Sequence, residues 1–206
     1  MKPARTLAKI ATLIGFATLL ANEALGIEWA NYYKPKGGIG WAHCGIRDTF
    51  DGGYLVVAES AEDEEGMRLF QKYLWVLKIT ATGVVQWSNA YGPETAGTVT
   101  LAQKDVGTTV AQGCDKGFLV AGRTFSFGSK KGDAWVLKLG WYGDIEWQFA
   151  YGDGGMRSYL PKDVKLTPDC GYVIVGQATI NTTGETDAWA MKLDQNGNLV
   201  WNFLYG

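Results

Sequence analysis

His43 and Cys44 are adjacent in the segment WAHCGIRD, and His43 is the chain's single histidine. A thiol beside an imidazole can act as a nucleophile with its base. The surrounding sequence is typical of a β-strand, however, in which successive side chains point to opposite faces. The two side chains therefore cannot easily hydrogen-bond to each other, and we interpret them as structural. No catalytic residue, metal-ligand set or cofactor motif is predicted from the sequence.

Asp194–Asn198, with the sequence DQNGN, alternates oxygen-bearing side chains as a calcium-binding loop does. Two similar segments, TATGV from Thr80 and GWYGD from Gly140, stand at equivalent places in the chain. They lack the oxygen ligands and keep the glycine. A tight turn between two strands therefore explains all three segments better than a metal site does.

Trp141 and Tyr142 occupy the tip of a predicted hairpin, where the equivalent segments hold small or polar residues. Aromatic side chains in a turn gain little from burial unless something covers them. They could stack on a sugar or on a protein partner. We take these two residues as the candidate ligand-binding residues, with packing on a neighbouring loop as the alternative.

Acidic and basic residues recur at fixed positions. Asp51, Asp115 and Asp169 each precede a glycine-containing turn, which accounts for their recurrence in the three segments. Lys78, Lys138 and Lys192 form a second set, and we expect each to face solvent or pair with a neighbouring aspartate. The run Glu62–Glu65 breaks the pattern; it predicts a solvated loop, or alternatively a weak site for a cation or a basic partner.

An internal repeat with a period of roughly 55 residues positions all of these side chains. Each copy predicts four short strands with period-2 alternation, and residues 27–206 show no persuasive helical period. Aromatic residues two positions apart share one strand face, which must be buried against the next copy. Seven of the nine tryptophans fall into two columns, which are Trp75, Trp135 and Trp189, and Trp29, Trp87, Trp147 and Trp201.

The pattern Asp-x-Trp-x-x-Lys, followed by Gly-x-x-x-Trp-x-x-x-Tyr-Gly, resembles the repeat of secreted bacterial and archaeal β-propeller proteins, which mostly lack an assigned activity. KLDQNGNLVW is also distantly similar to the tryptophan motif of quinoprotein propellers. The resemblance implies an all-β chain of four-stranded antiparallel blades. The first copy departs from the pattern, because Tyr73 replaces the aspartate and Lys34 follows the tyrosine in place of glycine.

The repeat divides residues 27–206 into three full blades plus one extra strand. A propeller ring usually contains about four to eight blades, so we expect an incomplete ring. A truncated chain, two chains that associate to close a ring, or another partner against the stack would each resolve the shortage. The copies marked in the sequence are approximately 27–83, 84–143, 144–197 and the start of a fourth at 198–206.

Residues 1–26 combine a basic start, an apolar run and small residues before the exported part, which predicts a signal peptide. The rival interpretation is a membrane anchor, for which the run is short. We therefore expect a secreted, periplasmic or cell-surface protein without a membrane span after removal of the signal. The formal net charge of −2 and the lack of a basic cluster disfavour nucleic-acid partners. Export permits one disulfide among Cys44, Cys114 and Cys170, but we favour isolated buried thiols.

These observations favour a non-catalytic binding or scaffolding module, or a fragment of one, with a protein or glycan partner. The alternative is a glycan-active or quinoprotein-like propeller enzyme whose site lies in further blades. A glycan enzyme would need two carboxylates that converge across a cleft. A quinoprotein would need a cofactor cavity with calcium ligands.

Overall fold

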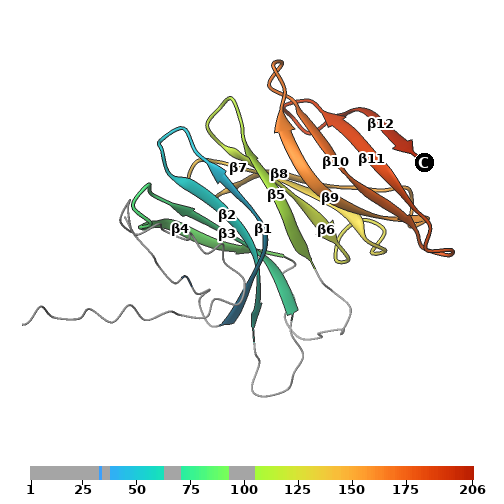
Figure 1. The fold of residues 1–206 in the computed structure, drawn as a ribbon, viewed down its shortest axis with the longest axis horizontal. Coiled ribbons are helices and arrows are strands. Elements are labelled where there is room, and N and C mark those ends of the chain that lie inside the picture. The colour runs from blue at the N-terminus through green and yellow to red at the C-terminus, as the bar shows by residue number, and fades with distance from the viewer. Residues whose placement is uncertain (1–32, 34–37, 63–70, 93–104) are drawn as a thin grey trace, which may run out of the picture.

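The computed structural model describes residues 33, 38–62, 71–92 and 105–206, which contain β-strands and no helix (Figure 1). Within this part of the chain, nothing has the length and apolar character of a membrane-crossing helix. The predicted all-β class with four-stranded antiparallel sheets is confirmed. The strands are β1 (Gly38–Asp48), β2 (Tyr54–Glu62), β3 (Gln71–Ile79), β4 (Val85–Tyr91), β5 (Val106–Gln112), β6 (Phe118–Thr124), β7 (Asp133–Leu139), β8 (Ile145–Tyr151), β9 (Arg157–Leu166), β10 (Tyr172–Ile180), β11 (Thr186–Leu193) and β12 (Leu199–Tyr205).

Each sheet is a simple meander of four consecutive strands. The first sheet has the order β1-β2-β3-β4, the second β5-β6-β7-β8 and the third β9-β10-β11-β12. Figure 1 shows the three sheets following one another in chain order, from blue-green to red. The strands that carry Trp87, Trp147 and Trp201 pair with the strand before them, as the last strand of a sheet. Each sheet therefore ends at the Tyr-Gly pair, so that residues 198–206 complete the third sheet and do not begin a fourth. The predicted extra strand with Trp29 lies outside the described residues.

Each tryptophan of the first column lies in a hydrophobic core cluster. Trp75, Trp135 and Trp189 are buried in β3, β7 and β11. Each indole Nε1 donates a hydrogen bond to a polar side chain on the next strand of its own sheet: Ser88, Gln148 and Asn202, respectively. Buried indoles need such a partner because the N–H would otherwise lose its bond to water. The prediction that these tryptophans face inward is confirmed.

Apolar side chains fill both junctions between neighbouring sheets. Between the first and second sheets the cluster includes Leu55, Val76 and Val120. Between the second and third sheets it includes Leu119, Val136 and Ile174, among others. The second sheet is thus covered on both faces, which accounts for the continuous burial of β7. Face-to-face burial against the next sheet is what the aromatic pattern predicts.

Neighbouring sheets are also joined by a repeated contact from the last strand of one sheet to a turn of the next. The Tyr91 hydroxyl donates to the Gly143 carbonyl at 2.6 Å, and the Tyr151 hydroxyl donates to Gly197 at the same distance. Both glycines have a φ of 84°. A Cβ on Gly197 would lie 2.9 Å from Phe149. Glycine is required at these turns by its backbone conformation and by the approach of the aromatic rings.

Candidate functional site

Two hairpin turns of each sheet lie at the same end of the strands, and together these turns form what we call the turn face. It contains residues 49–53, 113–117 and 167–171 between the first and second strands of the sheets. It also contains the turns between the third and fourth strands, 80–84, 140–144 and 194–198, because antiparallel pairing places them at the same end of each sheet. The sequence-predicted residues Trp141 and Tyr142 therefore lie on this face.

An aspartate–lysine ion pair supports the turn face in every sheet. Lys78 Nζ lies 2.9 Å from both carboxylate oxygens of Asp51. Lys138 pairs with Asp115 at 2.6 Å, and Lys192 pairs with Asp169 at the same distance. The predicted lysine–aspartate pairing is confirmed in all three sheets. The alternative expectation, that the lysines face solvent, is wrong for Lys78 and Lys138, because both side chains are buried under the neighbouring sheet.

Hydrogen bonding sets the charge state of these aspartates. Partial burial of Asp51 would raise its pKa. Bonds from the Thr49 hydroxyl, the Lys78 ammonium and the Gly53 amide outweigh that effect and lower its pKa to about 2. At Asp169 the Lys192 ammonium is the main cause, and the pKa is again about 2. Both carboxylates are therefore ionised at neutral pH and act as acceptors in the turns.

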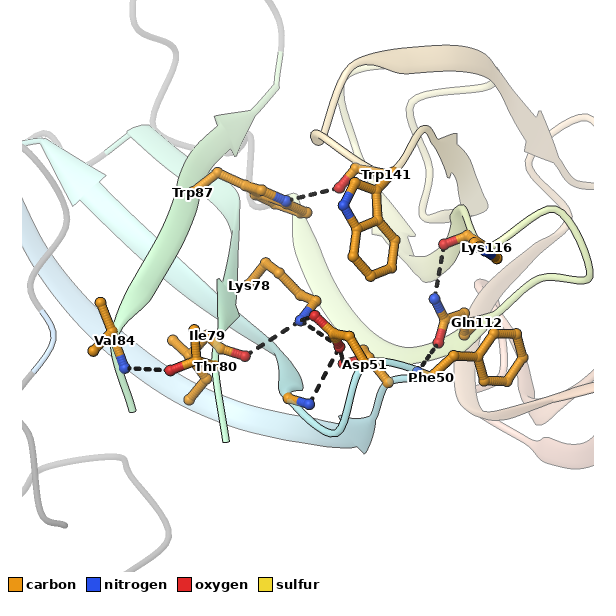
Figure 2. Close-up of polar contacts among 12 residues, drawn as sticks. Phe50, Asp51, Lys78, Ile79, Thr80, Val84, Trp87, Gln112, Lys116 and Trp141 are labelled. Atoms are coloured by element: carbon orange, nitrogen blue, oxygen red, sulfur yellow. Dashed lines mark hydrogen bonds and ion pairs between the residues drawn. The ribbon is translucent and has the colours of Figure 1, made fainter. Parts of the chain in front are cut away.

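Trp141 closes the junction between the first and second sheets (Figure 2). Its ring stacks on Phe118 with a centroid distance of 5.7 Å, and Lys78 Nζ lies 5.3 Å from its centroid. Its backbone carbonyl accepts a 2.9 Å hydrogen bond from Trp87 Nε1. These contacts give Trp141 a packing role over the buried ammonium of Lys78, with a favourable cation–π geometry.

Tyr142 lies in a different environment from Trp141. Its side chain is 78% exposed, so the two neighbouring aromatics do not form a joint platform. Phe50, on the adjacent sheet's turn, is also an exposed aromatic of the turn face. The sequence analysis did not single out Phe50. A signal was present, because the equivalent position in the other two turns is Cys114 and Pro168.

One polar bridge and one disulfide join the turns of adjacent sheets. Gln112 accepts a hydrogen bond from the Phe50 amide at 2.7 Å and donates one to the Lys116 carbonyl at 2.8 Å (Figure 2). A disulfide joins Cys114 to Cys170 across the next junction. The expectation of isolated thiols is therefore wrong for these two residues. They occupy different positions in their turns, so the repeat alone does not reveal that the sheets bring them together.

A charged cluster lies where the first strands of the sheets meet. Arg47 on β1 forms an ion pair with Asp163 on β9, with an Nη2–Oδ1 distance of 2.5 Å. Thr109 on β5 donates to the same carboxylate oxygen at 3.4 Å, and Lys165 Nζ lies 3.7 Å from Oδ2. The contact joins the first sheet to the third and shows that β1, β5 and β9 converge. We call these four residues the axial cluster.

The axial cluster keeps its carboxylate ionised. Burial would raise the pKa of Asp163, but the Val164 amide and the charges of Lys165 and Arg47 lower it. Sequence reasoning missed this cluster. Its signal is nevertheless present, because Asp163 stands where the other copies have Gly45 and Thr109. Residues that differ from their column are the better functional candidates, since residues shared by all copies serve the common architecture.

The Asp194 turn is a structural turn. Asp194 Oδ1 accepts hydrogen bonds from the backbone amides of Asn196 and Asn198, each at 2.8 Å. Its Oδ2 accepts a third from the Asn198 side chain. The carboxylate is therefore used within the turn, as an Asx-type turn requires, and the turn prediction is confirmed. Among the described residues no cluster has the make-up of a metal site.

Several predicted features cannot be placed. The pairing of β1 with β2 shifts register on both sides of Cys44, but the side chains of His43 and Cys44 lie outside the described part of the structure. The signal peptide, residues 1–26, and most of the acidic run from Glu62 to Glu65 also lie outside the described residues.

Comparison of the chain with protein-family models finds no match, and comparison with curated proteins finds none either. The resemblance to secreted propeller repeat proteins therefore remains a prediction. The geometry of the sheets and of the turn face is accordingly the only basis for assigning a function.

Proposed function

We propose that residues 27–206 form a non-catalytic binding or scaffolding module built of β-propeller blades in an incomplete ring. Three consecutive four-stranded meanders that pack face to face through the same tyrosine–glycine contact support this architecture. The convergence of β1, β5 and β9 on the axial cluster supports it further, because the first strands of propeller blades surround a common axis.

The turn face is the proposed binding surface, and the exposed side chains upon it are the observation that carries the proposal. Phe50 and Tyr142 present aromatic rings to solvent, and Lys165, on β9 just before the turn at 167–171, is largely exposed beside the Arg47–Asp163 pair. These residues differ from their columns, whereas the shared Asp–Lys pairs are used within the sheets. A rigid scaffold that displays variable residues on its turns is a common arrangement for recognition.

The partner we propose is a glycan or a protein with an acidic group. Aromatic rings stack on sugar rings or apolar patches, and two cations against one carboxylate give the axial cluster a net positive charge. The Cys114–Cys170 disulfide supports export to an oxidising compartment, where such partners are displayed. Secretion and the signal peptide remain part of this proposal.

A glycan array, followed by a hydrolase screen on each bound glycan, tests the function. We expect binding without turnover, and a Tyr142→Ala or Lys165→Ala variant that weakens it by about tenfold. Lys131→Ala, which removes the same charge from an exposed loop at the other end of the sheets, is the matched control and should bind normally. Turnover of any glycan would reject the non-catalytic assignment and favour the alternative propeller enzyme.

A further inference from the structure

One face of the third sheet repeats the docking surfaces of the first two sheets but lies exposed. This open face consists of Val173, Val175, Lys192, Trp201, Phe203 and Tyr205, which cross-strand pairing places on one side of β10, β11 and β12. Val175 is 42% exposed and Tyr205 58%, whereas Phe203, at 54%, differs little from its docked counterpart Phe149 at 46%. Val57 and Ala121, which stand in the column of Val175, are fully buried against the next sheet.

Trp201, Phe203 and Tyr205 form a row of aromatic rings on β12, which we call the β12 ladder. A row of the same residue types lies on β8. Trp147, Phe149 and Tyr151 run along β8, and the Tyr151 hydroxyl reaches the Gly197 turn of the third sheet. The equivalent rings on β12 keep the same mutual stacking: Trp201 and Phe203 have a centroid distance of 5.6 Å, against 5.5 Å for the pair on β8. The β12 ladder therefore already has the conformation that docks on a glycine turn.

The first sheet offers the matching receptor. Its turn contains Gly83, with a φ of 78°, and Trp75, Leu77 and Ile79 form an apolar cluster on the side away from the second sheet, where each is already at most 2% exposed. The second and third sheets present the same columns to the ladders of their neighbours. In this chain, however, Tyr33 packs on this cluster, and its hydroxyl donates to the Gly83 carbonyl at 2.6 Å. Tyr33 thus makes the contact that Tyr91 and Tyr151 make elsewhere.

We propose that the open face binds the first sheet of a second copy of this chain and replaces Tyr33 at the Gly83 turn. The new interface would continue the two junctions already present, with the Tyr205 hydroxyl donating to Gly83. When two copies do this reciprocally they form a two-fold ring of six sheets, within the usual range for propellers. Dimerisation would cover Val175 and Tyr205, which are 42% and 58% exposed in the single chain.

A second copy is the occupant because both halves of the contact belong to this chain. The open face carries the ladder, and the first sheet carries the glycine turn that fits such a ladder. The exchange replaces one tyrosine–glycine hydrogen bond with an identical one, so the gain comes from covering the remaining open face. The inference concerns β12 and the first sheet, and it does not depend on the binding role proposed for the turn face.

Two single-atom variants test the proposal with opposite signs. Tyr205→Phe removes the hydroxyl that would bind Gly83 of the second copy, and we expect it to raise the dimer dissociation constant roughly thirtyfold, because the reciprocal dimer contains this bond twice. Tyr33→Phe removes the hydroxyl of the competitor, and we expect it to lower that constant by a similar factor. General damage to folding cannot produce both results. The measurement is sedimentation equilibrium of the purified chain over a wide concentration range.

Phe203→Ser gives a smaller perturbation, because its docked counterpart Phe149 is still 46% exposed, and we expect roughly threefold weaker dimerisation. Met156→Ala is the matched control, since Met156 is an exposed apolar residue on the β8–β9 loop, away from the open face; it should leave the constant unchanged. A chain that stays monomeric in every variant overturns the proposal. So does a dimer indifferent to Tyr205, Tyr33 and Phe203, or a polymer in place of a discrete dimer.

Discussion

The second and third sheets share a sequence pattern but not an environment. Ala121 in β6 is fully buried, whereas Val175 in the same column of β10 is 42% exposed. The Lys138 side chain is 2% exposed beneath the third sheet, whereas that of Lys192 is 22% exposed. The strand order and the Asp–Lys pair are the same in both sheets, although Lys138 also pairs with Glu146. Burial in this molecule is therefore a property of the neighbouring sheet, and the same residue type has a different energetic weight in each copy.

A charge placed in the column of Ala121 and Val175 should have the largest effect on the free energy of unfolding. We expect Ala121→Asp to destabilise the protein by more than about 4 kcal/mol, because it places an unpaired carboxylate in a fully buried junction. Val175→Asp should cost less than about 1 kcal/mol, because its carboxylate stays in water. Urea unfolding followed by tryptophan fluorescence compares the two variants. Equal losses would show that the third sheet is covered in solution.

The two junctions differ in how their turns are linked. Replacing both Cys114 and Cys170 with serine removes a cross-link between residues 56 positions apart. We expect a loss of roughly 2–4 kcal/mol, from the greater freedom of the unfolded chain. Gln112→Ala, which removes the polar bridge of the other junction, should cost only about 1 kcal/mol. Denaturant titrations of the oxidised proteins measure both; a smaller loss for the cysteine pair than for Gln112→Ala would contradict this ranking.

Alkaline pH should weaken the junction between the first and second sheets. Burial is the main cause that raises the pKa of Tyr91 from 10.0 to about 12. Because the folded-state pKa is the higher one, the stabilisation is complete below about pH 10 and is lost as the pH rises from about 10 to about 12. The loss amounts to roughly 3 kcal/mol. Tyr91→Phe should flatten this part of a stability profile measured by urea unfolding, and an unchanged slope would exclude Tyr91 as its source.

The lysine column gives a smaller contrast. Lys138→Ala leaves Asp115 and Glu146 without their shared cation, and we expect a loss of about 1–2 kcal/mol, limited because both carboxylates are partly exposed. Lys192→Ala should cost less than about 0.5 kcal/mol, since water replaces the lost contact. Thermal unfolding at low and high salt measures both variants. A salt-sensitive loss only at Lys192 would reverse the comparison.

The smallest contrast concerns one hydroxyl group. Tyr151→Phe removes the hydrogen bond to Gly197, and we expect a loss of about 1 kcal/mol. Tyr205→Phe should leave the stability of the monomer unchanged, since the described residues provide Tyr205 with no equivalent glycine turn. The comparison requires unfolding curves at concentrations where the chain is monomeric. A similar loss at both positions would show that Tyr205 already has a partner within the chain.

Much of the fold is predictable from local pattern. The alternation around Trp189 predicts a strand with one buried face, and the Asn-Gly pair at Asn196 predicts a tight turn; both are confirmed. The equivalent strand of the second sheet, β7, is buried on both faces. The pairing of Lys138 with Asp115 was also predictable, because the acid recurs in the first turn of each copy and the base recurs on the third strand, which ends near that turn. These features depend on residues close in sequence or repeated at a constant interval, so the chain displays them without knowledge of the three-dimensional structure.

The candidate site was less accessible to sequence reasoning. Trp141 was marked for its unusual place in a turn, but only the position of Phe118 and Lys78 on other strands reveals that its ring packs between sheets. The Arg47–Asp163 pair joins two sheets that are not consecutive. Such contacts depend on how far one sheet rotates relative to the next, and no local pattern encodes that angle.

Strand periodicity, glycine turns and the tryptophan columns were all readable in the amino-acid sequence, because each arises from steric and hydrophobic preferences within a few residues. The packing of sheet against sheet decided the rest: which cysteines join, which lysines lose contact with water and which aromatic ladder is left uncovered. The physical reason is that burial and long-range pairing depend on the surface presented by a neighbour, and identical copies have different neighbours at the two ends of a stack.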